Sequence, residues 1–264
     1  MNNTEIKEAA RILFKKKLTK TGIKSLNHLE PKNITDAYRI QDELKVHYLS
    51  LKKNICIGKK IGCTSKAAQK QMNVTEPFYG NLFSKYSSKN INKLNSKYFF
   101  EPFAEPEISF RVREDIDISK APYTLDNIKN LLDGILCSIE IVDFRFQRSL
   151  SEIGAINLIS TNGASDYWIH NDRIFNIDEI DLNNFEVSIF IDNKLQEKGN
   201  TKNVLDNPIN AVLWLINTLC KNGEPMLKHQ FISSGSCTKA YRLNKGNRIK
   251  ADFATLGTIE FEYI

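Results

Sequence analysis

Two glutamates stand two residues apart in an otherwise apolar stretch, FAEPEISF, at residues 103–110. Side chains alternate along a β-strand, so Glu105 and Glu107 would point to the same side and lie close together. Two carboxylates in that position repel each other, so either one of them takes up a proton or a cation lies between them. Pro106 has no N–H to donate to a sheet ladder, and we therefore expect the pair at the edge or the start of a strand, next to solvent. The spacing predicts an open metal site.

A third carboxylate lies in the stretch CSIEIVDF, where Glu140 interrupts an apolar run typical of a buried strand. A buried charge without a partner costs several kcal/mol, so Glu140 needs one. Three glutamates would supply hard oxygen ligands, which suit Mg²⁺ or Mn²⁺ and leave positions for water and substrate. The alternative is that Glu140 pairs with Lys60 or Arg145 and that no metal binds. The residues by themselves leave both possibilities open.

The composition is that of an ordinary globular protein, with 264 residues, 41% of them hydrophobic and 26% charged. The net charge of +6 is spread along the chain without a concentrated basic face, so we expect no nucleic-acid partner. No apolar run reaches the roughly 20 residues of a membrane helix, and the N-terminal residues lack the features of a signal peptide, so we expect no membrane partner. Five scattered cysteines without a C-x-x-C pair indicate free thiols in a cytoplasmic protein rather than a zinc cluster.

The hydrophobic patterns predict an α+β protein, with a helical N-terminal region at residues 1–54 and one compact β-rich domain at residues 55–264. The expected helices cover residues 1–18, 35–53, 65–72, 124–134 and 206–223, with caps at Thr35, Thr64 or Ser65, Thr124 and Asp206 and with stops at Gly134 and Gly223. The expected strands cover residues 55–63, 107–114, 135–144, 229–240, 247–253 and 257–264, with a further hairpin that turns at Asp192-Asn193. Residues 73–95 are rich in Asn, Ser and Lys and predict a long loop, of the kind that often serves as a lid.

Eight stretches, in order along nearly the whole chain, are similar to a known family. They are DAYRIQ (36–41), KKIGCTSKAAQKQMNVTEPFYGNLF (59–83), FAEPEISF (103–110), SIEIVDFRF (138–146), NGAS (162–165), NPINAVLWLINTL (207–219), SGSCTKA (234–240) and NRIKADFATLGTIEFEY (247–263). Together they resemble the 2-keto-4-pentenoate hydratase and 4-oxalocrotonate decarboxylase family, within the superfamily that shares the fold of the fumarylacetoacetate hydrolase catalytic domain. The resemblance implies a mixed β-roll or barrel with a helical N-terminal part, a bound divalent metal and a homo-oligomer, in some members joined to the next enzyme of the pathway.

The resemblance also assigns roles to individual residues of this sequence. The metal ligands would be Glu105, Glu107 and Glu140, the catalytic residues Lys60 and Ser165, and the substrate-binding residues Gly235, Ser236 and Thr238. The substrates implied are small 2-oxo or 2-hydroxydienoic acids from the catabolism of aromatic compounds. Such an acid would chelate the metal, which would stabilise an enolate while a proton moves at C3 or C5.

The sequence departs from the family pattern in two places. The family commonly has an acid/base Asp after the proline of P-D-[FY]-G, whereas this chain has Phe78 in EPFYG. Thr161 replaces the usual Asp before NGAS, and the bulky pair Tyr167–Trp168 follows it. Because a carboxylate is lost from the expected pocket, the departures leave the identity of the reaction open.

The leading hypothesis is a metal-dependent hydro-lyase that hydrates a dienol through a metal-bound enolate. The alternatives are a decarboxylase, a hydrolase that cleaves the carbon–carbon bond of an acylpyruvate, and a non-catalytic relative that binds 2-oxo acids. No histidine lies near the acidic motifs in sequence, which counts against the hydrolase. Lys239 and Arg145 are candidates to bind a second carboxylate of the substrate, although either could be structural.

Overall fold

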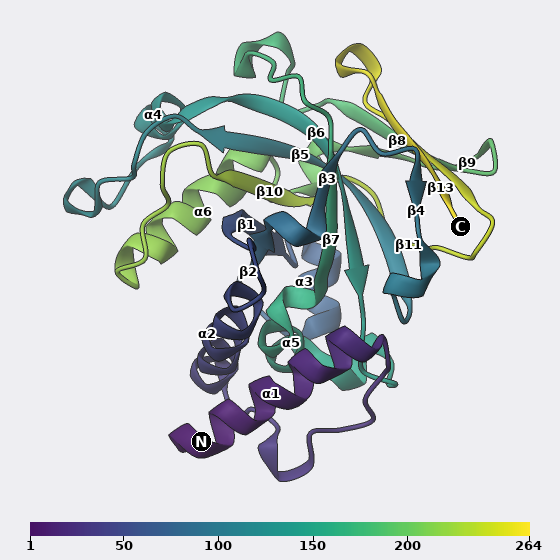
Figure 1. The fold of residues 1–264 in the computed structure, drawn as a ribbon. Coiled ribbons are helices and arrows are strands. Elements are labelled where there is room, and N and C mark those ends of the chain that lie inside the picture. The colour runs from purple at the N-terminus through teal and green to yellow at the C-terminus, as the bar shows by residue number, and fades with distance from the viewer.

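The computed structural model describes residues 1–264 and consists of a body of curved β-sheets with a group of helices at one end (Figure 1). The helices at that end are α1 (Asn3–Thr19), α2 (Ile34–Leu49), α3 (Lys66–Met72) and α5 (Leu150–Ser160). Two further helices, α4 (Leu125–Ile128) and α6 (Pro208–Lys221), lie beside the sheets. None of these helices combines the length and the apolar character that a membrane crossing requires. The arrangement confirms the predicted α+β class with a helical N-terminal part.

The larger of the two sheets has eight strands and carries the acidic motifs. Its main path runs β2-β1-β10-β5-β6-β7-β3, and β11 pairs with β5 beyond the end of β10. The strands are β1 (Cys56–Gly62), β2 (Phe78–Phe83), β3 (Ser87–Lys89), β5 (Pro102–Val112), β6 (Leu132–Asp143), β7 (Ser165–His170), β10 (Phe231–Ser236) and β11 (Tyr241–Arg242). It is a mixed sheet, because β1 runs parallel to β10 while β5 runs antiparallel to both of its long neighbours.

The smaller sheet has five strands in the order β4-β13-β12-β8-β9. They are β4 (Lys93–Leu94), β8 (Glu186–Ile191), β9 (Lys194–Asn200), β12 (Arg248–Asp252) and β13 (Thr258–Tyr263). The predicted hairpin is confirmed, since β8 and β9 pair across Asp192 and Asn193, and both turn residues have the positive φ that such a turn requires. The predicted pairing of the two closing strands is confirmed in β12 and β13.

The expectation that Pro106 marks a sheet edge is wrong. Pro106 lies in the middle of β5, with β6 on one side and β10 on the other. The carbonyl of Pro106 faces β10 and accepts a hydrogen bond from the backbone N–H of Cys237 at 2.9 Å. The nitrogen of Pro106 faces the same strand, at the point where the pairing of β10 with β5 is irregular between Ser233 and Ser236. A proline is tolerated in a central strand at such a bulge, because no ladder hydrogen bond is lost there.

Several predicted element boundaries also need correction. Residues 73–95 do not form a structureless loop, because β2, β3 and β4 lie within them. The N-caps of α2 and α6 are Asn33 and Asn207, whose side chains accept from backbone N–H groups of the first turn, and not Thr35 and Asp206. Gly134 lies inside β6 rather than at a helix end. The caps predicted at Ser65 and Thr124 are confirmed.

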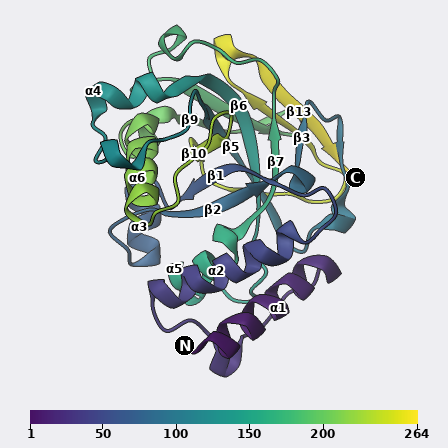
Figure 2. The same cartoon turned by 60° about the vertical axis from the view of Figure 1, so that its left-hand side comes forward.

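The interior is divided between two main apolar clusters. The larger cluster fills the space within and between the two sheets and extends to α6. The second cluster joins α1 and α2 to α5 and to residues at the ends of β2 and β6, and Figure 2 shows α1 and α2 side by side below the sheets. The N-terminal helices therefore share a core with elements from later in the chain, and the boundary expected after residue 54 stays a prediction.

A buried ionic cluster fixes α1 to the larger sheet. Lys17 of α1 pairs with Asp166 of β7, and Arg145 pairs with both Asp166 and Asp143, at 2.9 and 3.0 Å. All four side chains are at most 6% exposed. Arg145 is thus used within the fold, and its ion pairs are with Asp143 and Asp166 rather than with Glu140.

We expect the replacement of Lys17 by Met to destabilise the protein by about 3 kcal/mol, because the change leaves the buried Asp166 with one cation in place of two. Chemical denaturation of the two proteins would measure the difference. Lys15→Met is the matched control, because Lys15 is exposed on the same helix, and it should change the stability by no more than about 0.5 kcal/mol. Equal stability of the two variants would contradict a structural role for the pair.

Candidate metal centre and active site

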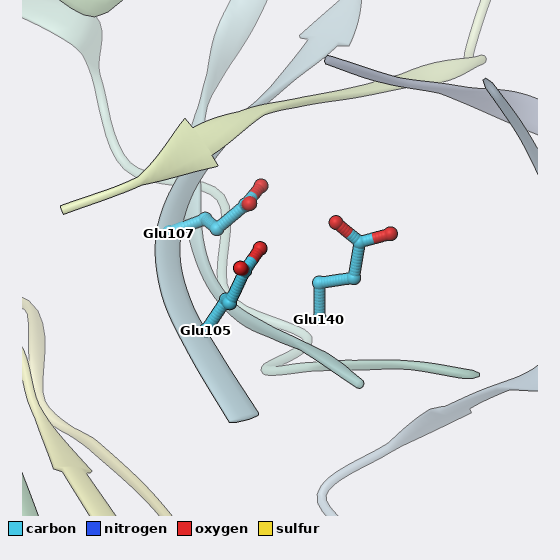
Figure 3. Close-up of side chains that lie close together, drawn as sticks. All are labelled: Glu105, Glu107 and Glu140. Carbon is cyan, nitrogen blue, oxygen red and sulfur yellow. The ribbon is translucent and has the colours of Figure 1, made fainter. Parts of the chain in front are cut away.

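The structure brings the three glutamates of the sequence motifs together on two adjacent strands. Glu105 and Glu107 share one side of β5, and Glu140 of β6 is the direct cross-strand neighbour of Glu105. One carboxylate oxygen from each lies within 4.8 Å of the others. Figure 3 shows the three carboxylates directed toward one space between them.

The electrostatics of this cluster fit a bound divalent cation. Glu107 and Glu140 are fully buried, and the Oε1 atom of each has no hydrogen-bond partner. Burial, together with repulsion from Glu140, raises the pKa of Glu105 to about 7 and that of Glu107 well above its ordinary value. A single ammonium group, that of Lys60, pairs with the cluster. Three carboxylates with unused oxygens beside one lysine make an oxygen-only site of the kind that Mg²⁺ and Mn²⁺ prefer.

Lys60 lies at the floor of the site on β1 and is 2% exposed. Its Nζ atom donates to the carbonyl of Gly163 at 2.9 Å and lies 3.1 Å from Glu140 Oε2. Burial alone would lower the pKa of Lys60, but the carboxylates of Glu140, Glu105 and Glu107 more than offset that effect and raise it. Lys60 is therefore a protonated donor with a third N–H that these two contacts do not use.

A chain of buried donors orients Glu107. Its Oε2 atom accepts from Ser233 Oγ and from the backbone N–H of Gly235 at 3.1 Å. Ser233 in turn accepts from the indole N–H of Trp168 at 3.1 Å. Sequence reasoning missed Ser233, although the period of two along β10 places it on the same face as Gly235. Trp168, noted only as a bulky departure, is 1% exposed and belongs to this chain of donors.

A cavity of about 590 Å³ opens beside the glutamates. Lys60, Glu105, Ser236 and Thr238 line it, together with many apolar side chains. Glu107 and Glu140 complete the carboxylate cluster without lining the cavity, and Gly235 contacts Glu107. Ser165 is the exception among the predicted site residues, because it lines two small recesses beside Asp166 instead.

Phe78, which stands where the family pattern has an Asp, lies in the wall of this cavity and is 6% exposed. Gly62 makes room for its ring, because a Cβ atom at that position would come within 2.6 Å of it. The Lys60 ammonium lies 6.0 Å from the ring centroid. The replacement therefore gives Lys60 an aromatic neighbour where a proton-transferring carboxylate was expected.

No model of a known protein family matches the sequence. The 4-oxalocrotonate decarboxylase of Pseudomonas putida is 26% identical over 246 residues, which cover 91% of this chain and 89% of that protein. The 2-oxo-hept-4-ene-1,7-dioate hydratase of Escherichia coli is 28% identical over 236 residues, covering 88% and 87% of the two chains. The 2-keto-4-pentenoate hydratase of Paraburkholderia xenovorans is 25% identical over 264 residues, covering 100% and 96%.

Solved structures agree with these relatives. The 4-oxalocrotonate decarboxylase from Pseudomonas putida G7, complexed with magnesium and adipate, superimposes with a TM-score of 0.93 at 24% identity, covering 100% of this chain and 99% of that one. A fumarylpyruvate hydrolase from Pseudomonas aeruginosa has a TM-score of 0.60 at 8% identity, covering 78% and 88%. The resemblance predicted from the sequence is confirmed, and the chain has the fold of these solved structures.

We expect Mg²⁺ binding to strengthen as the pH rises from 6 to 8, because Glu105 and Glu107 must lose their protons to act as ligands and both have raised pKa values. Affinity should rise by up to about tenfold per pH unit for each proton released. Isothermal titration calorimetry in two buffers of different ionisation enthalpy would count those protons. Binding without proton release near neutral pH would show that the pair is already ionised in the metal-free protein.

Ser233→Ala should weaken Mg²⁺ binding by about 10- to 100-fold, because Glu107 loses the hydroxyl that orients it. Ser234→Ala is the matched control, since Ser234 is equally buried but donates to the carbonyl of Ile108 and not to a glutamate. Trp168→Phe should act in the same direction as Ser233→Ala, with a smaller effect. Equal Mg²⁺ affinities of the two serine variants would remove Ser233 from the site.

Proposed function

We propose that this chain is a divalent-metal-dependent lyase that acts on a small 2-oxo or 2-hydroxydienoic acid, as a 2-keto-4-pentenoate hydratase does. The observation that carries the proposal is the meeting of Glu105, Glu107, Glu140 and Lys60 beside one cavity. The relatives named as hydratases and decarboxylases, which match along most of the chain, support the same reaction class.

The glutamates would hold Mg²⁺ or Mn²⁺, and the bound ion would act as a Lewis acid on the 2-oxo group and the carboxylate of the substrate. The magnesium in the solved decarboxylase supports a divalent ion, and the choice between the two metals is part of the proposal. The third N–H of Lys60 would bind a substrate oxygen and stabilise the negative charge that develops there. The hydroxyls of Ser236 and Thr238 would fix the acid end against the cavity wall.

In hydration, C5 of the dienol would gain a proton as the C2 hydroxyl loses its own, and water would then attack C4. The electron pair would rest on the oxygen at C2 until C3 takes up a proton, which balances the one that the attacking water loses. Lys60 is suited to the charge at that oxygen, because it is protonated and is fixed by its hydrogen bond to the Gly163 carbonyl and its ion pair with Glu140. The apolar wall around Phe78 keeps bulk water away from the reacting carbons, which strengthens each electrostatic contact within the site.

Decarboxylation is the second candidate, and Phe78 is the observation that favours it. Loss of carbon dioxide needs the same stabilised charge at C2 but no added water, so it depends less on the carboxylate that Phe78 replaces. None of the four histidines lines the cavity, and the structure therefore offers no support for a hydrolase with a His-Glu pair. A non-catalytic relative that binds 2-oxo acids would bind oxalate with Mg²⁺ and show no turnover.

The proposal includes three further expectations from the sequence. We place the enzyme in the cytoplasm, in agreement with its five free thiols, and in the catabolism of aromatic compounds, as the relatives suggest. We also expect a homo-oligomer, in which a complex with the next enzyme of the pathway is a further option. Sedimentation analysis of the purified protein would test the oligomer directly.

The test of the function is the loss of dienol absorbance when the purified protein and Mg²⁺ are mixed with 2-hydroxypenta-2,4-dienoate. A product heavier by one water indicates hydration, and carbon dioxide release from 4-oxalocrotonate indicates decarboxylation. EDTA should abolish either activity. Absence of turnover with pentadienoate, hydroxymuconate and oxalocrotonate substrates would overturn the lyase proposal.

Lys60→Met should lower kcat/KM by about 10²- to 10³-fold, because it removes the donor at the charged oxygen. The same change should increase the affinity for Mg²⁺, because a competing cation leaves the glutamates. Lys59→Met is the matched control, since Lys59 is also buried on β1 but pairs with Glu224 and Asn81. A Lys60 variant with full activity would rule out its role.

A further inference from the structure

The geometry points to a substrate whose end away from the 2-oxo acid is an extended, uncharged apolar group. This inference rests on the hydratase form of the proposed function, since the decarboxylase candidate would act on a substrate with a second carboxylate. It concerns the part of the cavity that the metal ligands and Lys60 do not occupy. Three observations carry it: the size of the cavity, the chemistry of its walls and the placement of its few charges.

The cavity is larger than a five-carbon acid requires. Its volume of about 590 Å³ lies within the range of about 300–1,000 Å³ that is typical of sites for drug-sized ligands. The head group of a 2-oxo acid fills only the portion next to Glu105 and Lys60. The remaining space can accept a tail of several further carbon atoms.

The walls around that space are apolar and come from separate elements. Met72 at the end of α3, Leu150 at the start of α5, Phe103 near the start of β5 and Phe144 after β6 all line it. Each of these four side chains is only half-buried, so it keeps apolar surface that the fold itself does not cover. The rings of Phe103 and Phe144 pack edge to face, with centroids 5.3 Å apart. Apolar surface left open inside a cavity is typical of a site for an apolar ligand.

The charged side chains that line the cavity do not favour the binding of a second carboxylate on the substrate. Apart from the metal site and Lys60, the charged lining residues are Glu197 and Lys239. The Glu197 carboxylate is held there by the backbone N–H of Lys239 at 3.0 Å and the hydroxyl of Tyr241 at 2.9 Å. The side chain of Lys239 is exposed to solvent. A distal carboxylate would therefore leave water for a mainly apolar cavity whose lining also holds a fixed negative charge.

The test compares ligands of equal length by calorimetry in the presence of Mg²⁺. Oxalate presents the head group alone, 2-oxohexanoate adds an apolar tail, and 2-oxoadipate has the same six carbons with a terminal carboxylate. We expect 2-oxohexanoate to bind at least about tenfold more tightly than 2-oxoadipate. We also expect 4-phenyl-2-oxobutanoate to bind more tightly than 2-oxohexanoate, because each buried methylene contributes about fourfold in affinity.

The outcomes separate this inference from the proposed function. If oxalate does not bind, the proposed function fails and the inference fails with it. If oxalate binds but 2-oxoadipate binds as tightly as 2-oxohexanoate, the inference alone is overturned, and Lys239 becomes the residue that binds the second carboxylate.

Leu150→Lys provides a second test, because it places a cation in the apolar wall. The ratio of the affinities for 2-oxohexanoate and 2-oxoadipate should fall at least about tenfold in this variant. Leu125→Lys is the matched control, since Leu125 is likewise the first residue of a helix, α4, and lies 54% exposed outside the cavity. An unchanged ratio in Leu150→Lys would show that the tail does not lie against α5, and the inference would be wrong.

Discussion

The repulsion among three carboxylates, two of them fully buried, is the constraint on which the rest of this structure depends. Glu105, Glu107 and Glu140 lie within 4.8 Å of one another and share the ammonium group of Lys60. A fold can hold such a cluster only if each carboxylate is fixed by rigid neighbours and if a cation can enter. The central strands β5 and β6 supply the rigidity, since their register sets Glu105 opposite Glu140. The bulge in β10 turns Ser233 and Gly235 toward Glu107.

The helices at one end of the molecule supply apolar side chains to the cavity beside the three glutamates and Lys60. The helices α3 and α5 supply one wall of the cavity, and α5 also joins the core that α1 and α2 build. The ionic cluster of Lys17, Asp166 and Arg145 fixes α1 to β7, the strand that also carries Trp168. The strands that hold the glutamates and the helices that line the cavity are thus connected to each other through the shared core and the ionic cluster.

Phe78 affects which reaction the site can catalyse, although relatives named for either reaction match most of the chain. Relatives named as hydratases and as decarboxylases match this chain at 25–28% identity, so similarity alone does not choose between them. The charge-stabilising part of the site, with three glutamates and Lys60, suits either reaction. The aromatic ring beside Lys60 affects only the steps in which a carboxylate would move a proton to or from water. The site residues shared by both reactions therefore do not distinguish them, and Phe78 is the position at which the two would differ.

The sequence by itself determined the α+β class, the hairpin at Asp192-Asn193 and the pairing of Glu105 with Glu107, because these depend on local periodicity and turn chemistry. The sequence also identified Lys60 and Arg145 as the two candidate ion-pair partners of Glu140. Only the tertiary structure decided between them, because Arg145 is taken by Asp143 and Asp166. The central position of Pro106, the donors that hold Glu107 and the apolar cavity were equally out of reach of the sequence. Each of these features depends on contacts between strands and helices that are far apart in the chain. Local sequence patterns do not predict which of these elements pack together.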